Sequence, residues 1–343
     1  MSLSSPSLNR TAVGWPTQSA PAAFGARAIA RAHNRLFADT QRTLQISLGL
    51  IWLLDGALQL QSFMYGGGFI ATLKATSAGQ PLWIADSVNW AANTMHSNQA
   101  PLNTLFALVQ IWIGFGLLNR RTVKPALAVS LAWSLLVWWF GEGFGMLFMS
   151  MSSPLSGAPG AALLYLMVAL VVWPGEHPGG LLGVRGARLL WGALWLAMAW
   201  LWLGSAGSSP NAVGEAISGA PAGLAWLAHV QEWLATATQG HGLAIGLTLA
   251  AVSAAIGVTV ARSWHPRAFL VLSVLINLVF WIVGQGFGGL FTGSATDPNS
   301  APLLILLACA LYALVGQPAR APDPAPAAIN DLSAATPHPH PPT

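Results

Sequence analysis

The sequence predicts an all-α integral membrane protein with eight transmembrane helices, built as two tandem four-helix bundles that form a parallel repeat. Three observations predict this fold: a composition too apolar for a soluble protein, eight long apolar segments, and self-similarity with a period of 143 residues. Of the 343 residues, 54% are hydrophobic and only 7% are charged. Soluble domains have about 25% charged residues, so this chain has too few charges to cover a water-exposed surface.

Eight segments approach the ~20 apolar residues that a helix needs to cross a bilayer. They are 44–63, 101–119, 125–149, 159–174, 187–205, 241–261, 267–291 and 301–317. The fourth and eighth are short, so we expect irregular backbone ahead of them, which a membrane tolerates only where protein or water covers it. Ahead of the eighth, Asp297 and Pro298 predict an N-cap and a first-turn proline.

The Lys and Arg residues predict the orientation, because cytoplasmic loops carry an excess of them. With eight spans, thirteen of the 14 Lys and Arg residues fall on one side of the membrane and only Lys74 falls on the other. We therefore expect an inner (plasma) membrane protein with both termini in the cytoplasm. The basic charges lie between apolar segments and form no soluble basic face, which argues against nucleic-acid binding.

These boundaries divide the chain into five regions. They are a basic cytoplasmic N-terminal segment (1–43), a first four-helix membrane unit (44–174), a cytoplasmic linker (175–186), a second four-helix membrane unit (187–317) and a disordered Pro/Ala-rich cytoplasmic tail (318–343). Residues 1–23 have the composition of a disordered segment. Residues 24–43 fit an amphipathic basic helix that suits an anionic cytoplasmic leaflet.

The internal repeat aligns residues 49–173 with residues 192–316 without a gap, and this alignment pairs Pro159 with Pro302. Each unit has an even number of predicted spans. Both copies therefore have the same orientation and would be related by an axis along the membrane normal.

A glycine-rich string occurs near the end of the third span of each unit. The glycines are Gly141, Gly143 and Gly145 in the first copy and Gly284, Gly286 and Gly288 in the second. Three glycines within five residues weaken a helix, so the strings predict a close approach of two helices or a break. They are not phosphate-binding loops, because no strand precedes them and they lie in the membrane.

Each unit also has one long outer loop, 62–100 and 205–240, with a short helical pattern in it. The patterns are Trp83–Thr94 and Trp226–Ala237, each with two Trp residues seven apart. Tryptophan favours the membrane–water interface. We therefore expect helices that lie at the outer headgroup level, or that cap the bundle as a lid.

Two ionisable side chains lie within the spans: Asp55 in the first, and Glu142 near the outer end of the third, where the second copy has Gln285. Such residues are costly in a membrane and indicate function, here a proton-linked or ligand-binding carboxylate that faces the bundle interior. The structural alternatives are a hydrogen bond from Asp55 to Gln59 or Gln110, and simple exposure of Glu142 at the interface.

Two sets of candidate metal ligands lie toward the outer side. They are Met95, His96, Met146 and Met149 in the first copy, and His229 with Glu232 in the second. Thioether and imidazole groups suit copper(I). Methionine is also an ordinary core residue, and neither set recurs in the other copy, so we predict no metal site.

The first two spans carry the motifs of a family resemblance. The first span begins Arg42-Thr-Leu-Gln-Ile-Ser-Leu-Gly49 and ends Asp55-Gly-Ala-Leu-Gln-Leu60, and the second reads Leu105-Phe-Ala-Leu-Val-Gln-Ile-Trp-Ile-Gly-Phe-Gly-Leu-Leu118. In these features each unit resembles the DoxX/DoxD-like family of bacterial membrane proteins, which usually has Lys where Gln59 stands and often Glu where Gln110 stands. The resemblance covers 42–173 better than 187–316. It implies four-helix bundles and, in some relatives, sulfur or quinone redox systems, with quinone as the implied cofactor.

The sequence contains no Ser/His/Asp, Cys/His or Walker-type constellation, which argues against an enzyme. Together with the resemblance, this predicts an accessory membrane subunit in a redox or assembly process at the outer face, with other membrane or periplasmic proteins as partners. The rival hypothesis is a small-solute or proton-linked transporter, which rests on the parallel repeat and the two intramembrane carboxylates. A third is a purely structural, partner-binding protein.

Overall fold

The computed structural model describes residues 21–149, 152–175 and 178–315, with side chains from residue 39 onward. Within these ranges all regular secondary structure is helical, so the predicted all-α class is confirmed. The disorder predicted for 318–343 and for nearly all of 1–23 concerns residues outside the described ranges. Met151 also lies outside the described ranges, as do the side chains of the predicted amphipathic helix up to residue 38.

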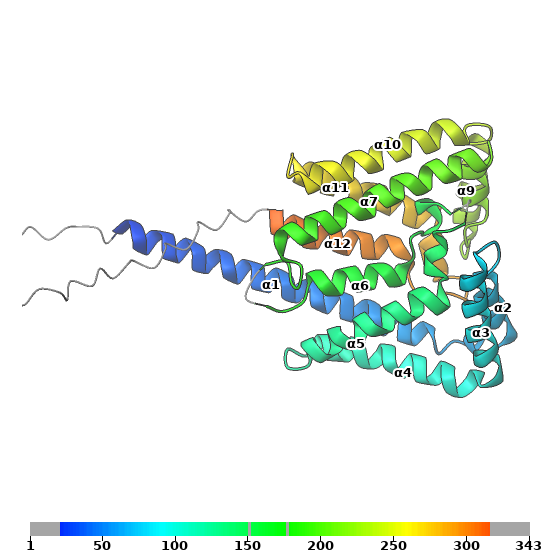
Figure 1. The fold of residues 1–343 in the computed structure, drawn as a ribbon, viewed down its shortest axis with the longest axis horizontal. Helices are drawn as coiled ribbons and strands as arrows, with labels where there is room; N and C mark the ends of the chain where they lie inside the picture. Colours follow the sequence, from blue (N-terminus) through cyan, green and yellow to red (C-terminus); the bar gives the residue numbers. More distant parts are fainter. Residues whose placement is uncertain (1–20, 150–151, 176–177, 316–343) are drawn as a thin grey trace, which may run out of the picture.

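Eight helices run lengthwise in one bundle (Figure 1). They are α1 (Pro21–Leu58), α4 (Gln99–Leu118), α5 (Val123–Leu136), α6 (Ala161–Val171), α7 (Gly183–Ser208), α10 (Gly242–Ala261), α11 (Pro266–Val283) and α12 (Ser300–Val315). Helix α1 projects beyond the bundle at one end, which we call the α1 end (Figure 1). Each of the eight helices overlaps one predicted span.

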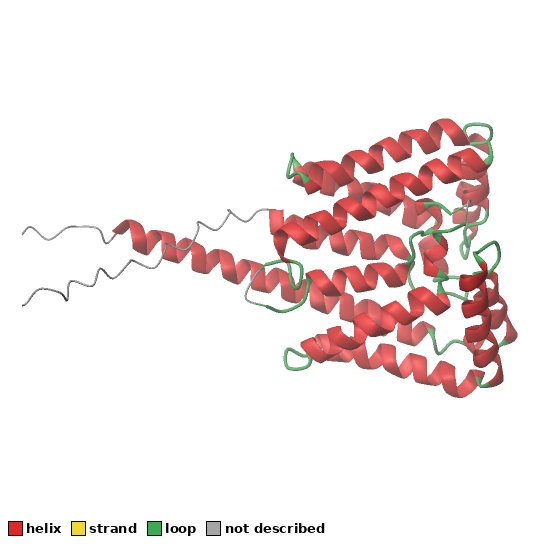
Figure 2. Cartoon of the chain, viewed as in Figure 1, coloured by secondary structure: helices red, strands yellow, loops and turns green. Residues whose placement is uncertain are grey.

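Four short helices lie toward the opposite end, which we call the short-helix end (Figure 1). They are α2 (Gly67–Ala75), α3 (Leu82–Ser97), α8 (Ala212–Ser218) and α9 (Ala225–Ala237). The predicted loop helices coincide with α3 and α9, whereas α2 and α8 carry no clear helical period and were not predicted. Figure 2 shows that irregular backbone also gathers between the short helices and the nearby ends of α6 and α12.

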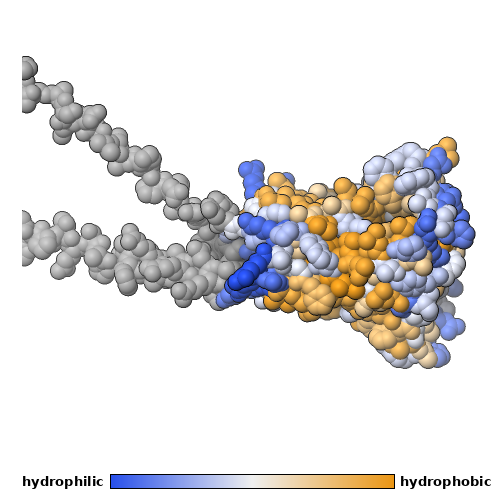
Figure 3. Space-filling model, turned by 90° about the horizontal axis from the view of Figure 1, so that it is seen from below, coloured by the Kyte–Doolittle hydropathy of each residue, from blue (hydrophilic) through white to orange (hydrophobic). Residues whose placement is uncertain are grey.

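The described structure is compatible with insertion into a membrane. Figure 3 shows a broad hydrophobic belt between two hydrophilic ends. Among the described residues, five helical segments are long and apolar enough to cross a membrane: α4, α5 with the π-turn η2 (Val137–Gly141), α7, α10 and α11. The shorter helices α6 and α12 are also apolar.

The two predicted units share one hydrophobic core. Helices α6 and α12 pack against each other at its centre, and α12 also contacts α1. The largest cluster of buried side chains contains residues of both units, from Leu44 to Leu314. Eight of the eleven residues of α6 are buried. The halves therefore stabilise each other and are not two independently filled bundles.

Glycines let the first two long helices of each half approach closely. A Cβ atom at Gly114 of α4 would lie 2.9 Å from the carbonyl oxygen of Gly49 on α1. A Cβ atom at Gly257 of α10 would lie 3.0 Å from the carbonyl oxygen of Gly192 on α7. Small residues at such crossings are what allows membrane helices to pack backbone to backbone.

We predict that Gly114→Val and Gly257→Val each lower the free energy of unfolding by roughly 1–3 kcal/mol, because the added side chain overpacks the crossing. Gly207→Val is the matched control, since a Cβ atom at this helical glycine would meet no heavy atom within 4 Å. Denaturant unfolding of the detergent-solubilised protein measures the three losses. Equal losses at all three positions would contradict the tight crossings.

Candidate functional site

The glycine strings end two of the long helices. The helix that continues from α5 through η2 ends at Gly141, and α11 ends at Val283. The predicted third and seventh spans, 125–149 and 267–291, are therefore too long, because both strings leave the helical conformation. Positive φ angles follow in both copies: 61° at Gly145 and 69° at Gly288.

These two glycines also make close backbone contacts. A Cβ atom at Gly145 would lie 1.8 Å from the carbonyl oxygen of Pro159, and one at Gly288 would lie 2.4 Å from the carbonyl carbon of Pro298. A side chain at either position would therefore be strained in conformation and blocked by backbone. The strings thus bring the broken chain against the segment that leads into α6 or α12.

A tryptophan fixes each break from the preceding helix. The indole Nε1 of Trp138 donates a hydrogen bond of 2.9 Å to the carbonyl oxygen of Pro159. The indole Nε1 of Trp281 donates one of the same length to the carbonyl oxygen of Pro298. The two halves therefore satisfy a backbone carbonyl at the start of α6 and α12 in the same way.

A side chain from the break also caps each short helix. The carboxylate Oε1 of Glu142 accepts a 3.0 Å hydrogen bond from the backbone N–H of Ala162. In the second half, the amide Oε1 of Gln285 accepts a 3.1 Å bond from the N–H of Ala301. First-turn N–H groups have no acceptor within their own helix, so these two side chains satisfy donors that would otherwise be unpaired.

The hydrogen bonds correct the register of the repeat. The tryptophans that donate these bonds, Trp138 and Trp281, are 143 positions apart in the sequence. The prolines whose carbonyl oxygens accept them, Pro159 and Pro298, are only 139 positions apart. The predicted match of Pro159 with Pro302 is therefore wrong by four residues. The chain between the break and the last helix is four residues shorter in the second half, and an ungapped alignment could not show this.

Aromatic contacts connect the short helices to the breaks. Phe144 lies edge-on to Trp138, with ring centroids 4.9 Å apart, and Phe287 lies edge-on to Trp281 at 5.1 Å. From α3, Trp83 reaches Phe144 at 5.5 Å. From α9, Trp226 reaches Phe287 at 6.3 Å. Helices α3 and α9 are therefore packed onto the breaks by equivalent side chains.

Asp55 lies deep in the bundle and exposes only 2% of its surface. Its Oδ2 accepts a short hydrogen bond from the hydroxyl of Tyr165 on α6. Within the described residues its Oδ1 has no hydrogen-bond partner. The side-chain Nε2 of the predicted partner Gln59 instead donates a hydrogen bond to Oδ1 of Asn103. Gln110 is buried, and its Oε1 has no partner among the described residues.

Three helices hold the Asp55–Tyr165 pair in place. The ring of Tyr165 packs against Trp52, which lies one turn before Asp55 on α1, with centroids 4.2 Å apart. The indole Nε1 of Trp52 donates a 3.1 Å hydrogen bond to the hydroxyl of Ser130 on α5. Tyr165 was missed in the sequence, although a tyrosine in the middle of an apolar span was the signal that could have revealed it.

Asp297 adds a third carboxyl group from the second half. Its Oδ1 accepts a 2.7 Å bond from the N–H of Asn299, and α12 begins only at Ser300, so the predicted N-cap role is wrong. Burial raises the pKa of Asp297 above its ordinary value, against the lowering effect of hydrogen bonds from Thr296 and Asn299. Asp297 also lies close enough to Asp55, Glu142 and Tyr165 to act on each electrostatically. We call these four residues the carboxylate cluster.

The loop that carries Asp297 is attached to the first half. The side-chain Nε2 of Gln61 donates a 3.0 Å hydrogen bond to the carbonyl oxygen of Ala295. The side chain of Asn299 packs against Gly157, where a Cβ atom would lie 2.2 Å from its Oδ1. These contacts place Asp297 at the junction between the halves.

The carboxylate cluster has no counterpart in the second half. By the register above, Met198 stands where Asp55 would be repeated, Leu304 where Tyr165 would be, and Gln285 where Glu142 would be. Met198 is fully buried. The second half thus has equivalent breaks and caps but lacks the ionisable groups.

The candidate metal ligands differ in exposure. Met95 is buried, whereas His96 beside it is exposed. His229 is exposed, and its Nδ1 lies 2.8 Å from the carbonyl oxygen of Ala225. Among the described residues, no group of three or more His, Cys, Asp or Glu side chains is placed to hold a metal ion.

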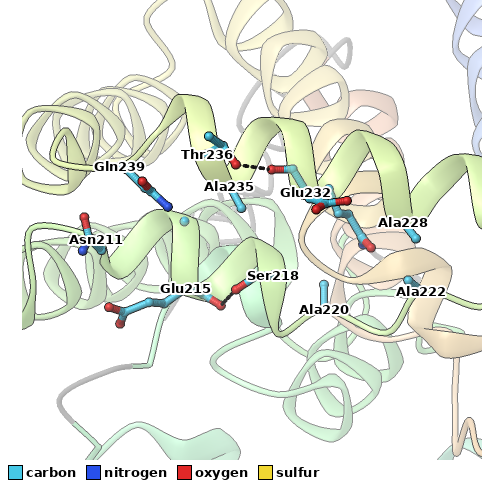
Figure 4. A pocket seen from close by; sticks show the side chains of 12 residues that line it. Asn211, Glu215, Ser218, Ala220, Ala222, Ala228, Glu232, Ala235, Thr236 and Gln239 are labelled. Carbon is cyan, nitrogen blue, oxygen red and sulfur yellow. Dashed lines mark hydrogen bonds between the residues drawn. The ribbon is translucent and has the colours of Figure 1, made fainter.

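An open polar groove of about 490 Å³ lies between α8 and α9 (Figure 4). Glu215 of α8 and Glu232 of α9 line it together with alanines and amides. Both glutamates are exposed, and Glu215 accepts a 3.1 Å hydrogen bond from the hydroxyl of Ser209. The groove is therefore an open feature of the short-helix end.

Comparison with known proteins yields no match to a protein-family model, a curated protein or a solved structure. A family assignment therefore rests on the sequence motifs of the first two spans, and a function on the geometry of the carboxylate cluster.

We predict that Glu142→Ala and Gln285→Ala each destabilise the protein by roughly 0.5–2 kcal/mol, because each removes a cap from a helix N-terminus. Glu142→Gln should keep the fold, since the second half makes the same bond with an amide. Thermal unfolding in detergent compares the three variants. A loss in Glu142→Gln as large as in Glu142→Ala would show that the cap is not the structural role of this side chain.

Proposed function

We propose that the chain is an eight-span inner-membrane protein of the DoxX/DoxD-like kind, acting as an accessory membrane subunit in a redox or assembly process at the outer face. The observation that carries the proposal is the carboxylate cluster. Ionisable groups inside a membrane bundle are expensive and serve function by default. Here they lie beside the breaks onto which the helices of the short-helix end are packed.

Eight spans are supported by the arrangement of the helices. Besides the five long apolar segments, α1 runs through the bundle, and α6 and α12 are apolar helices at its centre. Breaks filled by protein explain how two helices this short can belong to a membrane domain. A parallel repeat is supported by the equivalent hydrogen bonds of Trp138 and Trp281 and by the equivalent caps.

The proposed orientation places the α1 end in the cytoplasm. The guanidinium of Arg42 donates a 2.8 Å bond to the carbonyl oxygen of Leu117, at the end of α4. Arg188 donates to the hydroxyl of Ser263 in the turn after α10. These basic residues satisfy helix ends on the side where the positive-inside rule expects them.

A quinone, the cofactor implied by the resemblance, does not fit the cluster as it stands. A quinone carbonyl needs hydrogen-bond donors, but the hydroxyl of Tyr165 already donates to Asp55. Oδ1 of Asp55 and Oε2 of Glu142 could donate to such a carbonyl only while they carry a proton, and the surrounding chain shields both atoms from contact with a ligand. A redox role would therefore be carried with a partner.

A second candidate is a proton-linked transporter. The specific observation in its favour is that Asp55 and Glu142 are shielded while no described cation pairs with them. Carboxylates of this kind form proton relays in many transporters.

The topology is tested by cysteine labelling in a Cys309→Ser background. We predict that Ser97→Cys and Gln239→Cys react with a membrane-impermeant maleimide added from outside intact cells or spheroplasts. Asn119→Cys and Trp264→Cys should react only after the membrane is opened. All four side chains are exposed, so access depends on the side of the membrane alone. Labelling of position 119 or 264 from outside would contradict eight spans with cytoplasmic termini.

The function is tested by purification in mild detergent followed by mass spectrometry, and by proteoliposome flux. The accessory role predicts a membrane or periplasmic protein that co-purifies in a fixed ratio, and no flux from the purified chain. Turnover of thiosulfate and quinone by the chain alone would contradict it. Proton-coupled solute flux that Asp55→Asn abolishes, while Asp86→Asn does not, would favour the transporter.

A further inference from the structure

The carboxylate cluster brings together groups from four places in the chain. Asp55 comes from α1, Glu142 from the first break, Tyr165 from α6, and Asp297 from the loop ahead of α12. The hydroxyl of Tyr165 interacts electrostatically with all three carboxyl groups. One buried hydroxyl at the junction of the two halves therefore bonds to Asp55 and lies within electrostatic reach of Glu142 and Asp297.

The cluster has acceptors without donors. Oδ1 of Asp55 and Oε2 of Glu142 are shielded from solvent and accept no hydrogen bond within the described residues. The Asp55 side chain is 2% exposed, so water does not solvate its charge. No described Lys, Arg or His acts on either carboxyl group; the only charged group that does is Asp297, another acid.

Charge neutralisation is therefore required. Burying one unpaired carboxylate costs several kcal/mol, and a second negative charge nearby adds repulsion. Binding a proton removes both costs at once, because a neutral carboxyl group needs no counter-ion. It also turns the unpaired oxygen into an O–H group, which can donate a hydrogen bond to a neighbouring acceptor.

A proton fits this site better than a metal ion does. A metal cation needs several oxygen ligands that converge on one point. No group of three or more His, Cys, Asp or Glu side chains in the described chain is arranged to hold one. A proton needs only one oxygen and no cavity, and the bond from Tyr165 to Oδ2 leaves Oδ1 of Asp55 free to carry it.

We propose that Asp55, Glu142 and Asp297 form one proton-binding site that spans the two halves, with Tyr165 as the hydroxyl that holds Asp55 in place. The chain has one such site, because Met198, Leu304 and Gln285 replace the corresponding groups in the second half. Proton binding goes beyond the accessory role and would equally serve a transporter.

The position of Asp297 gives the site a structural consequence. Its loop is fixed to the first half through Gln61 and Asn299. When the acids are neutral, no repulsion opposes this contact, and each proton lost adds charge at the junction. Proton occupancy should therefore stabilise the attachment of the second half to the first.

Infrared difference spectroscopy of the full chain in lipid nanodiscs tests proton binding directly. Between alkaline buffer and a mildly acidic buffer that stays above the ordinary pKa of Asp and Glu, the carbonyl stretch of a protonated carboxylic acid should appear at the lower pH. Asp55→Asn should remove part of this band, and Tyr165→Phe should shift it, because the carboxyl group loses its hydrogen bond. Asp86→Asn, an exposed acid on α3, should leave the band unchanged.

Two outcomes would overturn the proposal. One is a spectrum without a carboxylic-acid band that depends on Asp55, Glu142 or Asp297. The other is a band that disappears when sodium replaces choline at constant pH, since this would show a cation site. Because Asn and Phe keep the size of the replaced side chains, retained helicity in circular dichroism distinguishes a lost proton site from a lost fold.

The pH dependence of stability tests the role of Asp297. Its pKa is raised in the folded protein by burial, so the folded state binds the proton more tightly than the unfolded state. This contribution to stability is complete below the ordinary pKa of Asp and is lost as pH rises through the raised pKa. We predict that the unfolding temperature falls with rising pH, and that Asp297→Asn flattens the fall whereas Asp86→Asn does not. An unchanged slope in Asp297→Asn would contradict coupling between the proton and the junction.

Discussion

The hydrogen bond from the backbone of α6 to Glu142, and its counterpart from α12 to Gln285, is the interaction on which the architecture depends. Two helices of 11 and 16 residues begin inside the bundle, where the membrane supplies no water for their first-turn N–H groups. A side chain from the preceding helix replaces that water. The tryptophan bonds to Pro159 and Pro298 satisfy the neighbouring carbonyls. Without these partners the irregular backbone would carry unpaired polar groups, each at a cost of a few kcal/mol.

This way of ending and restarting helices also creates the carboxylate cluster. Because α6 and α12 start inside the bundle, the segments ahead of them enter the protein interior. One brings Gly157 against Asn299, and the other brings Asp297 near Asp55 and Tyr165. In the first half the cap is an acid that can also hold a proton, whereas in the second half it is a neutral amide. The equivalent hydrogen bonds thus occur in both halves, whereas the ionisable groups of the cluster that lie on α1, the first break and α6 occur only in the first.

Much of the fold follows from the sequence. Each predicted apolar segment overlaps one of the eight lengthwise helices, and the tryptophans seven residues apart placed α3 and α9. The glycine strings predicted an approach or a break, and both occur: the strings break the helices and contact Pro159 and Pro298. The strong local signals, span length and glycine content, were sufficient for these elements. The short helices α2 and α8 were missed because neither has an apolar face long enough to give a period.

Most of the site depends on contacts that local pattern does not contain. The sequence pattern around Asp297 predicts a helix cap. Its position near Asp55, however, depends on how the two halves pack. Tyr165 adds a single hydroxyl group to an apolar span, and only the fold shows that this hydroxyl faces Asp55. The four-residue shift between the copies falls in the segment between break and helix, which is visible only through its hydrogen bonds. Likewise, a shared core follows from the contact of α6 with α12 and not from the sequence of either.

Amide hydrogen exchange at Ala162 and Ala301, measured in lipid nanodiscs, tests most directly whether side chains from the breaks cap the two central helices. If Glu142 and Gln285 hold these amides, both exchange as slowly as amides in the middle of α6 and α12, although they lie in the first turn. The first-turn amide of Trp226 in the exposed helix α9 provides the comparison for an uncapped, hydrated start. Exchange at Ala162 and Ala301 as fast as at Trp226 would contradict the capping of both helices and the buried junction built on it.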